Sequence, residues 1–200
     1  MRSKWLIVLL SIAAAQGAGK DRPKFSPSPI TDYPNRQTSD QVTVAAHPYI
    51  TEADAQPAFG KVNPYHHGVL PVLIIIRNDS DQTLGFDRMT VEFITPSRDR
   101  VEATPAADIR FLTGPRQPSL TPGPIPGRTP RVSRNKNPLN TWEIEGRAFS
   151  ARMLPPKESA SGFFYFQAPY RSGSKLYLTG IRQASSGKEL LYFEIVLDKP

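Results

Sequence analysis

The sequence has 200 residues, a formal net charge of +7 and no cysteine. This length suits one β-domain with an apolar core, and without cysteine its stability must come from apolar burial rather than disulfides. The basic balance keeps a domain soluble, and it also suits contact with anionic envelope polymers, acidic lipid head groups or nucleic acid.

Residues 1–19 have the features of a secretory signal peptide. Arg2 and Lys4 precede an apolar run from Trp5 to Ala15 that is short for a membrane span, and small residues suited to cleavage follow. An uncleaved N-terminal anchor is the alternative, whereas the absence of cysteine excludes a lipid-anchored lipoprotein. The sequence therefore predicts an exported protein, periplasmic or extracellular, with no transmembrane segment after signal removal. Loss of Arg2 and Lys4 lowers the formal charge from +7 to +5.

The next residues predict a linker, a first strand and a short helix. Residues 20–40 contain four prolines among charged and small polar residues, which indicates a flexible Pro-rich N-terminal linker. From Gln41 to Ala46 apolar and polar residues alternate, as in an edge strand. Thr51 and Asp54 have the spacing of a cap on a single helical turn.

The run from Val69 to Arg77 predicts the central strand of a sheet. Five consecutive aliphatic residues from Val72 to Ile76, four of them β-branched, indicate burial on both faces. Pro71 lacks a backbone donor, so we place it at the start of this strand. The polar residues Asn78 to Gln82 then predict a turn, and the alternation from Met89 to Ile94 predicts a half-buried strand.

The sequence predicts a short strand at Val101 and a helical turn within Ala106–Leu112. The amino-acid composition then changes at residue 113. Residues 113–138 contain seven prolines, five basic residues and no acidic residue. This composition predicts a disordered, basic, Pro-rich insertion with polyproline character.

The C-terminal third has the most regular β-pattern. Four segments predict strands, namely Ala148–Leu154, Gly162–Phe166, Lys175–Arg182 and Leu190–Leu197. In the last of them we expect Leu191, Phe193, Ile195 and Leu197 to face one way and Tyr192 and Glu194 the other. About seven short strands in all predict an all-β antiparallel sandwich as a single domain over residues 41–198.

Two motifs resemble immunoglobulin-like modules of uncharacterised exported bacterial envelope proteins. They are "GVLPVLIIIRNDSDQTL" in the middle of the chain and "MLPPKESASGFFYFQAP" further on. The resemblance covers Gln41 to Leu197 and is interrupted by the Pro-rich insertion. It implies an immunoglobulin-like fold and an extracytoplasmic location. It implies no catalytic residue, because the polar parts of the two motifs, Asn78 to Asp81 and Pro155 to Gly162, are turns between strands.

The sequence contains no motif of a catalytic or cofactor site. It has neither a Gly-x-Ser-x-Gly elbow nor a Gly-rich phosphate loop, so we expect no catalytic residue and no cofactor. His66 and His67 are adjacent and would point to opposite faces of a strand, which argues against a shared metal ion. The segment from Asp79 lacks the glycine and glutamate of a calcium loop.

Two groups of residues are candidate binding sites. Arg128, Arg131 and Arg134 recur every third residue, so a polyproline helix would align their guanidinium groups toward an anionic ligand. Phe163 and Tyr165 would face the same side of a strand, and they form a partner or glycan contact if that side is exposed.

The resulting interpretation is a non-catalytic β-sandwich module that binds a protein or an anionic polymer in the bacterial envelope. Nucleic acid is not expected, because the basic segment lacks interleaved aromatic residues. The alternatives are a divergent secreted hydrolase or sugar-active enzyme, and an envelope-assembly chaperone with an exposed strand edge at Gln41–Ala46.

Overall fold

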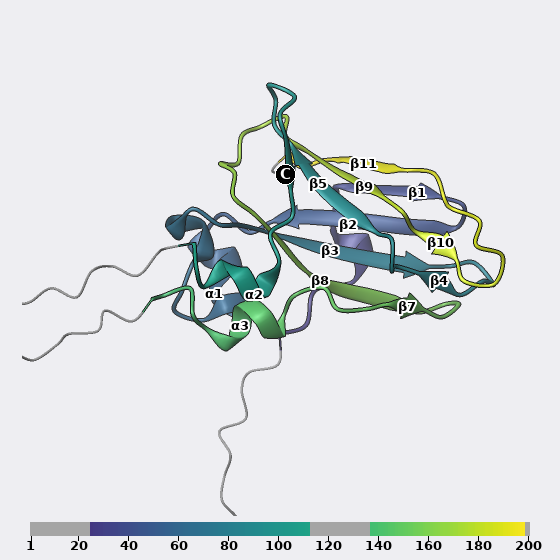
Figure 1. Cartoon of the computed structure of the whole chain (residues 1–200), viewed down its shortest axis with the longest axis horizontal. Coiled ribbons are helices and arrows are strands. Elements are labelled where there is room, and N and C mark those ends of the chain that lie inside the picture. The colour runs from purple at the N-terminus through teal and green to yellow at the C-terminus, as the bar shows by residue number, and fades with distance from the viewer. Residues whose placement is uncertain (1–24, 113–136, 199–200) are drawn as a thin grey trace, which may run out of the picture.

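The computed structural model describes residues 25–112 and 137–198, and these form three antiparallel sheets (Figure 1). Sheet A has the strand order β1 (Arg36–Ser39), β2 (Val42–Pro48), β3 (Leu70–Asn78), β8 (Ser159–Phe166). Sheet B has the order β10 (Arg182–Gln183), β4 (Leu84–Gly85), β7 (Met153–Leu154). Sheet C has the order β11 (Phe193–Val196), β9 (Lys175–Thr179), β5 (Thr90–Ile94), β6 (Arg100–Glu102). The short helices are η1 (Ile30–Asp32), α1 (Glu52–Phe59), η2 (Pro64–His67), α2 (Ala106–Ile109) and α3 (Trp142–Gly146).

The all-β sandwich expected from the sequence is confirmed, with eleven strands in the described residues rather than about seven. The predicted central strand is also confirmed. β3 pairs with β2 on one side and with β8 on the other, and Leu70 to Ile76 are all buried. Pro71 lies near its start, as expected.

Alternate residues of β3 contribute to two different apolar cores. Val72, Ile74 and Ile76 face the interior of the sandwich, where they belong to a cluster with buried residues of sheets B and C. Leu73 and Ile75 face the opposite side and belong to a second cluster with residues of α1 and α3. Because side chains of a strand alternate in direction, a strand that is apolar at every position requires two covers.

The second core is covered by the helices, which Figure 1 shows gathered at one end of sheet A. α1 begins at the predicted cap, because the Thr51 hydroxyl accepts a hydrogen bond from the Asp54 backbone N–H. It ends at Gly60, whose φ of 68° favours glycine. Sheet B lies at the other end of the molecule (Figure 1).

Part of the segment for which we expected a linker is structured. Phe25, Ile30 and Tyr33 pack against the second core. The Phe25 ring contacts Tyr49 and Phe163 at centroid distances of 6.3 and 5.5 Å. This segment therefore helps to cover the outer face of sheet A.

The expected edge strand at Gln41–Ala46 is an interior strand, which corrects the prediction. β2 extends to Pro48 and pairs with β3 on one side and β1 on the other. β1 and β2 are joined through Asp40 and Gln41, which adopt φ values of 50° and 61°. Such turns usually contain glycine or asparagine, so the sequence did not indicate this hairpin.

Two other expectations are corrected in the C-terminal third. Of the strand predicted over Ala148–Leu154, only Met153 and Leu154 form β7, while Ala148 makes an isolated bridge to Phe163. Leu191 is 69% exposed, because β11 begins two residues later, at Phe193. Phe193, Ile195 and Leu197 are buried as expected.

The turn after β3 is held by a fully buried asparagine. The Asn78 side-chain amide donates to the carbonyl oxygens of Gln82, Leu154 and Pro155 at 2.8, 3.2 and 3.0 Å. Its Oδ1 accepts from the Ser80 N–H and hydroxyl. The polar cluster after β3 thus connects sheet A to β7 of sheet B, and the prediction of a turn is confirmed.

Among the described residues, no helix is both long and apolar enough to cross a membrane. The predicted signal peptide at 1–19 and nearly all of the predicted insertion at 113–138 lie outside the described residues.

Ile75→Asp is expected to abolish folding. Ile75 is 5% exposed within the second core, and an unpaired buried carboxylate costs more than about 4 kcal/mol, a large part of the stability of a typical domain. Asp79→Ala is the matched control, because Asp79 makes a half-exposed pair with Arg77. Circular dichroism and urea unfolding should show a native Asp79→Ala protein with partner binding intact. A folded Ile75→Asp protein would contradict the double burial of β3.

Candidate functional site

The predicted binding residues lie in two different parts of the chain. Arg128, Arg131 and Arg134 lie outside the described residues. Phe163 and Tyr165 are each 1% exposed, so the condition for their surface role is not met and the prediction is corrected. They do face the same side of β8, but helices and the N-terminal segment cover that side.

Tyr165 has a structural role within the second core. Its hydroxyl donates a 2.7 Å hydrogen bond to the backbone carbonyl of Ile144 in α3. Burial raises the pKa of this hydroxyl, which therefore stays protonated and remains a donor at all physiological pH values. Burial likewise raises the pKa of Tyr49, which packs edge-on against Phe163.

The outer face of sheet C carries aromatic and charged side chains that contact one another. We define the open face of sheet C by six outward residues: Glu92, Arg100, Lys175, Tyr177, Tyr192 and Glu194. The strand register places Glu194, Tyr177 and Glu92 side by side across three strands. Unlike the side chains on the outer face of sheet A, these are exposed or half-buried.

Aromatic and guanidinium groups stack along this open face. The Tyr177 and Tyr192 rings lie 5.4 Å apart with an interplanar angle of 32°. The Arg100 guanidinium lies over the Tyr177 ring at 5.1 Å. Tyr192 is 51% exposed, and Leu191, the preceding residue in the chain, is 69% exposed. The Tyr192 end of the stack is therefore open to solvent.

Two ion pairs cross the open face between neighbouring strands. Arg100 donates to Glu92 at 2.8 Å, and Lys175 donates to Glu194. Exposed pairs of this kind contribute about 0–1 kcal/mol to stability, so their main effect is to fix the positions of charged groups around Tyr177. The sequence placed Tyr192 and Glu194 on the side away from the core, but Tyr177 and Arg100 join them only through the strand register.

Histidine and carboxylate side chains meet at the start of α1. His47 Nε2 lies 3.9 Å from Asp54 Oδ1, and His66 Nδ1 lies 3.1 Å from Glu52 Oε1. The second pair is well exposed. In the described part of the chain, no group of three or more histidine, cysteine and acidic residues could hold a metal ion. These pairs connect β2 and η2 to the first turn of α1.

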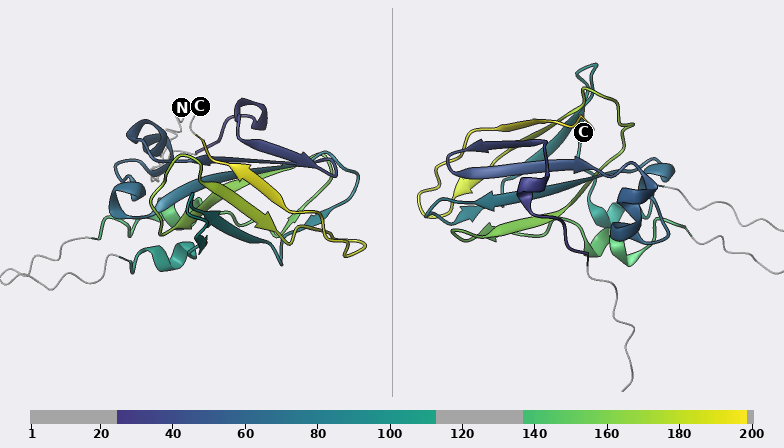
Figure 2. Two further views of the ribbon diagram at one scale, coloured as in Figure 1. Left: turned by 90° about the horizontal axis from the view of Figure 1, so that it is seen from above. Right: turned by 180° about the vertical axis from the view of Figure 1, so that it is seen from behind.

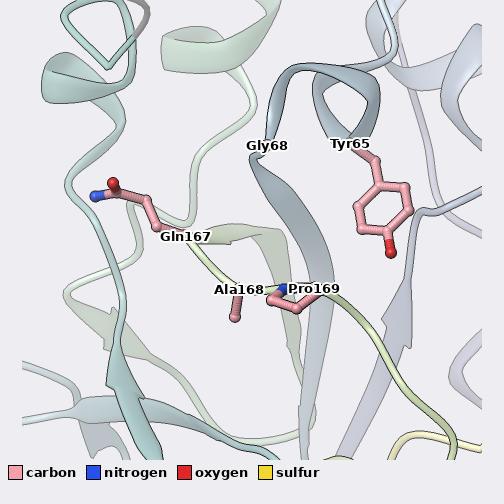
Figure 3. A pocket seen from close by; sticks show the side chains of 5 residues that line it. All are labelled: Tyr65, Gly68, Gln167, Ala168 and Pro169. Carbon is pink, nitrogen blue, oxygen red and sulfur yellow. The ribbon is translucent and has the colours of Figure 1, made fainter.

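A hollow of about 390 Å³ lies between η2 and the loop after β8, lined by Tyr65, Gly68, Gln167, Ala168 and Pro169 (Figure 3). Figure 3 shows the Tyr65 ring and the Gln167 side chain on opposite sides of Gly68. The Tyr65 hydroxyl accepts from the Tyr170 N–H, and the Gln167 amide donates to Thr104. Both polar groups are thus engaged in holding loops, and neither histidine–carboxylate pair contributes to the lining.

Tyr165→Phe tests whether Tyr165 is structural. The change leaves the Ile144 carbonyl without its buried donor, and we expect the free energy of unfolding to fall by about 1–2 kcal/mol. Binding to any partner should stay unchanged, because residue 165 is not at the surface. Chemical denaturation together with a binding titration measures both quantities. Weakened binding at unchanged stability would contradict the assignment.

No protein-family model and no curated protein matches the chain. Two solved structures have a distant likeness to it. A protein from Bacillus subtilis, described as a "putative lipoprotein (ycdA)", is 12% identical with a TM-score of 0.37, and the match covers 81% of this chain. The chain spans 38% of the length of that protein. A functionally unknown protein from Listeria monocytogenes is 12% identical with a TM-score of 0.34, and the match covers 82% of each chain.

Proposed function

We propose that the chain is an exported, non-catalytic β-sandwich module of the bacterial envelope that binds another protein through the open face of sheet C. The observation that carries this proposal is the stack of Arg100, Tyr177 and Tyr192 on an uncovered sheet face. Export is supported by the signal-peptide pattern of residues 1–19.

The composition of the open face favours a protein as its ligand. Tyrosine and arginine are the residues that most often dominate the binding energy of protein interfaces, particularly with apolar neighbours. Here Tyr192 is half-exposed, and Leu191, the preceding residue in the chain, is exposed as well. The ion pairs of Glu92 and Glu194 surround this centre with charge of both signs, which gives orientation and selectivity to a docked surface.

A non-catalytic role is supported by the structural contacts that the polar side chains near α1 and near Tyr65 make. Both histidine–carboxylate pairs join neighbouring elements at α1, and the polar groups of the hollow near Tyr65 hold loops together. A hydrolase or sugar-active enzyme would use such groups on a substrate. The enzyme alternative predicts that His47→Ala abolishes an activity on a defined substrate.

The double variant Tyr177→Ala/Tyr192→Ala tests the open face. We expect it to weaken partner binding at least tenfold, about 1.4 kcal/mol, because it removes the aromatic centre of the interface. A photo-crosslinker at position 192 in the exported protein identifies the partner, and calorimetry with that partner measures the affinity. Thermal unfolding should change little, since Tyr192 is half-exposed and neither tyrosine belongs to the two apolar cores.

The matched control is Phe111→Ala/Met153→Ala, which removes two large apolar side chains that are 66% and 58% exposed. Neither residue belongs to sheet C. This control should bind the partner as the unaltered protein does. Equal binding by both double variants would contradict a role of the open face.

A second candidate function is binding of an anionic envelope polymer by Arg128, Arg131 and Arg134. Its support is the charge of residues 113–138, with five basic residues and no acidic one. Guanidinium groups pair with carboxylates and phosphates in a bidentate manner.

Replacement of Arg128, Arg131 and Arg134 by serine tests this second candidate. We expect binding to dextran sulfate, or to vesicles containing anionic lipid, to weaken at least tenfold at low salt and to lose most of its salt dependence. The control replaces the exposed residues Lys61, Arg152 and Lys188 by serine, which changes the net charge equally. Equal losses in both triple variants would indicate a general charge effect and contradict a specific site.

A further inference from the structure

β11 forms one end of sheet C and lies alongside β1, which forms one end of sheet A (Figures 1 and 2). We call the space between them the seam. A hollow of about 310 Å³ occupies it, lined by residues Pro34 to Gln37 and Glu194 to Val196. The two strands are not neighbours in any sheet, so no backbone ladder closes the sandwich here.

The hydrogen-bond pattern of β11 shows which backbone groups are directed toward the seam. The Leu197 N–H donates to the Ser174 carbonyl at the end of the β11–β9 pairing. In an antiparallel ladder hydrogen-bonded pairs alternate with non-bonded ones, so Phe193 and Ile195 bond to β9. The backbone groups of Glu194 and Val196 are therefore directed away from β9.

Side chains of the β1 segment occupy part of this free edge. The Glu194 N–H donates to Gln37 Oε1 at 2.7 Å, and the Asn35 side-chain amide donates to the Asp198 carbonyl at 2.8 Å. Within the described residues, the Val196 N–H and carbonyl make no hydrogen bond. Gln37 thus takes a bonding position that the backbone of a neighbouring strand would fill.

We propose that β11 is a docking edge for an extended peptide segment of a partner protein, which adds to sheet C as a fifth strand within the seam. The chemistry of the edge selects this occupant. Backbone donors and acceptors at every second residue, Glu194 and Val196, match the repeat of an extended chain. A sugar or a lipid does not present this repeat. When the peptide binds, Gln37 and Asn35 give up these bonds to its backbone. β1 also moves away from β11, because a strand between them needs about 4.8 Å on each side.

The side chains around the seam indicate what the segment should contain. Pro34, Ile195 and Val196 give the lining an apolar part, and Arg36 and Glu194 give it one charge of each sign. A segment with apolar residues at alternate positions and no strong net charge suits this lining. The inference goes beyond the open face of sheet C, because it uses the backbone of β11 rather than the rings of Tyr177 and Tyr192.

The test compares Val196→Pro with Val196→Ala, using the protein without residues 1–19 and heptapeptides selected from a random display library. Both variants lose the valine side chain, but only proline removes the N–H. Because this N–H does not bond to β9, the β9 ladder is retained. We expect Val196→Pro to weaken peptide affinity at least tenfold and Val196→Ala to change it less than threefold. Peptides N-methylated at alternate residues should also bind at least tenfold more weakly, and this comparison needs no variant protein.

Amide hydrogen exchange gives an independent measurement. The Val196 amide should exchange rapidly in the free protein and become protected when peptide binds. Equal peptide affinity for Val196→Pro and Val196→Ala, or a library that yields no binder, would overturn the proposal. A concentration-dependent dimer of the peptide-free protein that Val196→Pro abolishes would assign the edge to a second copy and also overturn it. The Tyr177→Ala/Tyr192→Ala variant should bind the peptides normally, which separates this proposal from the open face.

Discussion

The pairing of β3 on both edges together with its burial on both faces is the constraint on which the rest of the structure depends. A strand with a continuous apolar run needs partners in four directions, and different elements of the domain supply them. β2 and β8 satisfy its backbone, sheets B and C cover one face, and the helices cover the other. Within the described residues, sheet A is consequently covered on both of its faces, whereas the outer face of sheet C is open to solvent.

The structural features that could be predicted from the sequence are those that depend on a local residue pattern. We could predict the buried strand β3, the helix cap at Thr51 and the alternation in β11, because each depends on a periodicity or a spacing within one segment. The hairpin of β1 and β2 could not be predicted, because Arg36 to Ser39 are polar. In addition, the chain turns at Asp40 and Gln41 without a glycine. The packing of Phe25, Ile30 and Tyr33 was also hidden, because their spacing fits neither a helix nor a strand.

In the candidate sites, too, local residue patterns could be predicted from the sequence, whereas packing between distant segments could not. Alternation correctly placed Phe163 and Tyr165 on one side of β8, but only distant segments, α1 and α3 among them, decide that this side is buried. Conversely, Arg100, Tyr177 and Tyr192 come from three separate segments, and the register of sheet C brings them together. A site made by register cannot be found from one sequence, because a shift of one residue would turn every side chain to the other face.

The position of Phe25 limits how much of the N-terminus can be lost. Its ring packs on Tyr49 and Phe163 and lies beneath the Arg147 guanidinium, which is 5.2 Å from its centroid. Proteolytic trimming that stops before residue 25 leaves this contact intact. Trimming beyond it would expose aromatic rings over sheet A and produce a shorter protein prone to aggregation. An intact second core therefore requires a chain that begins no later than residue 25.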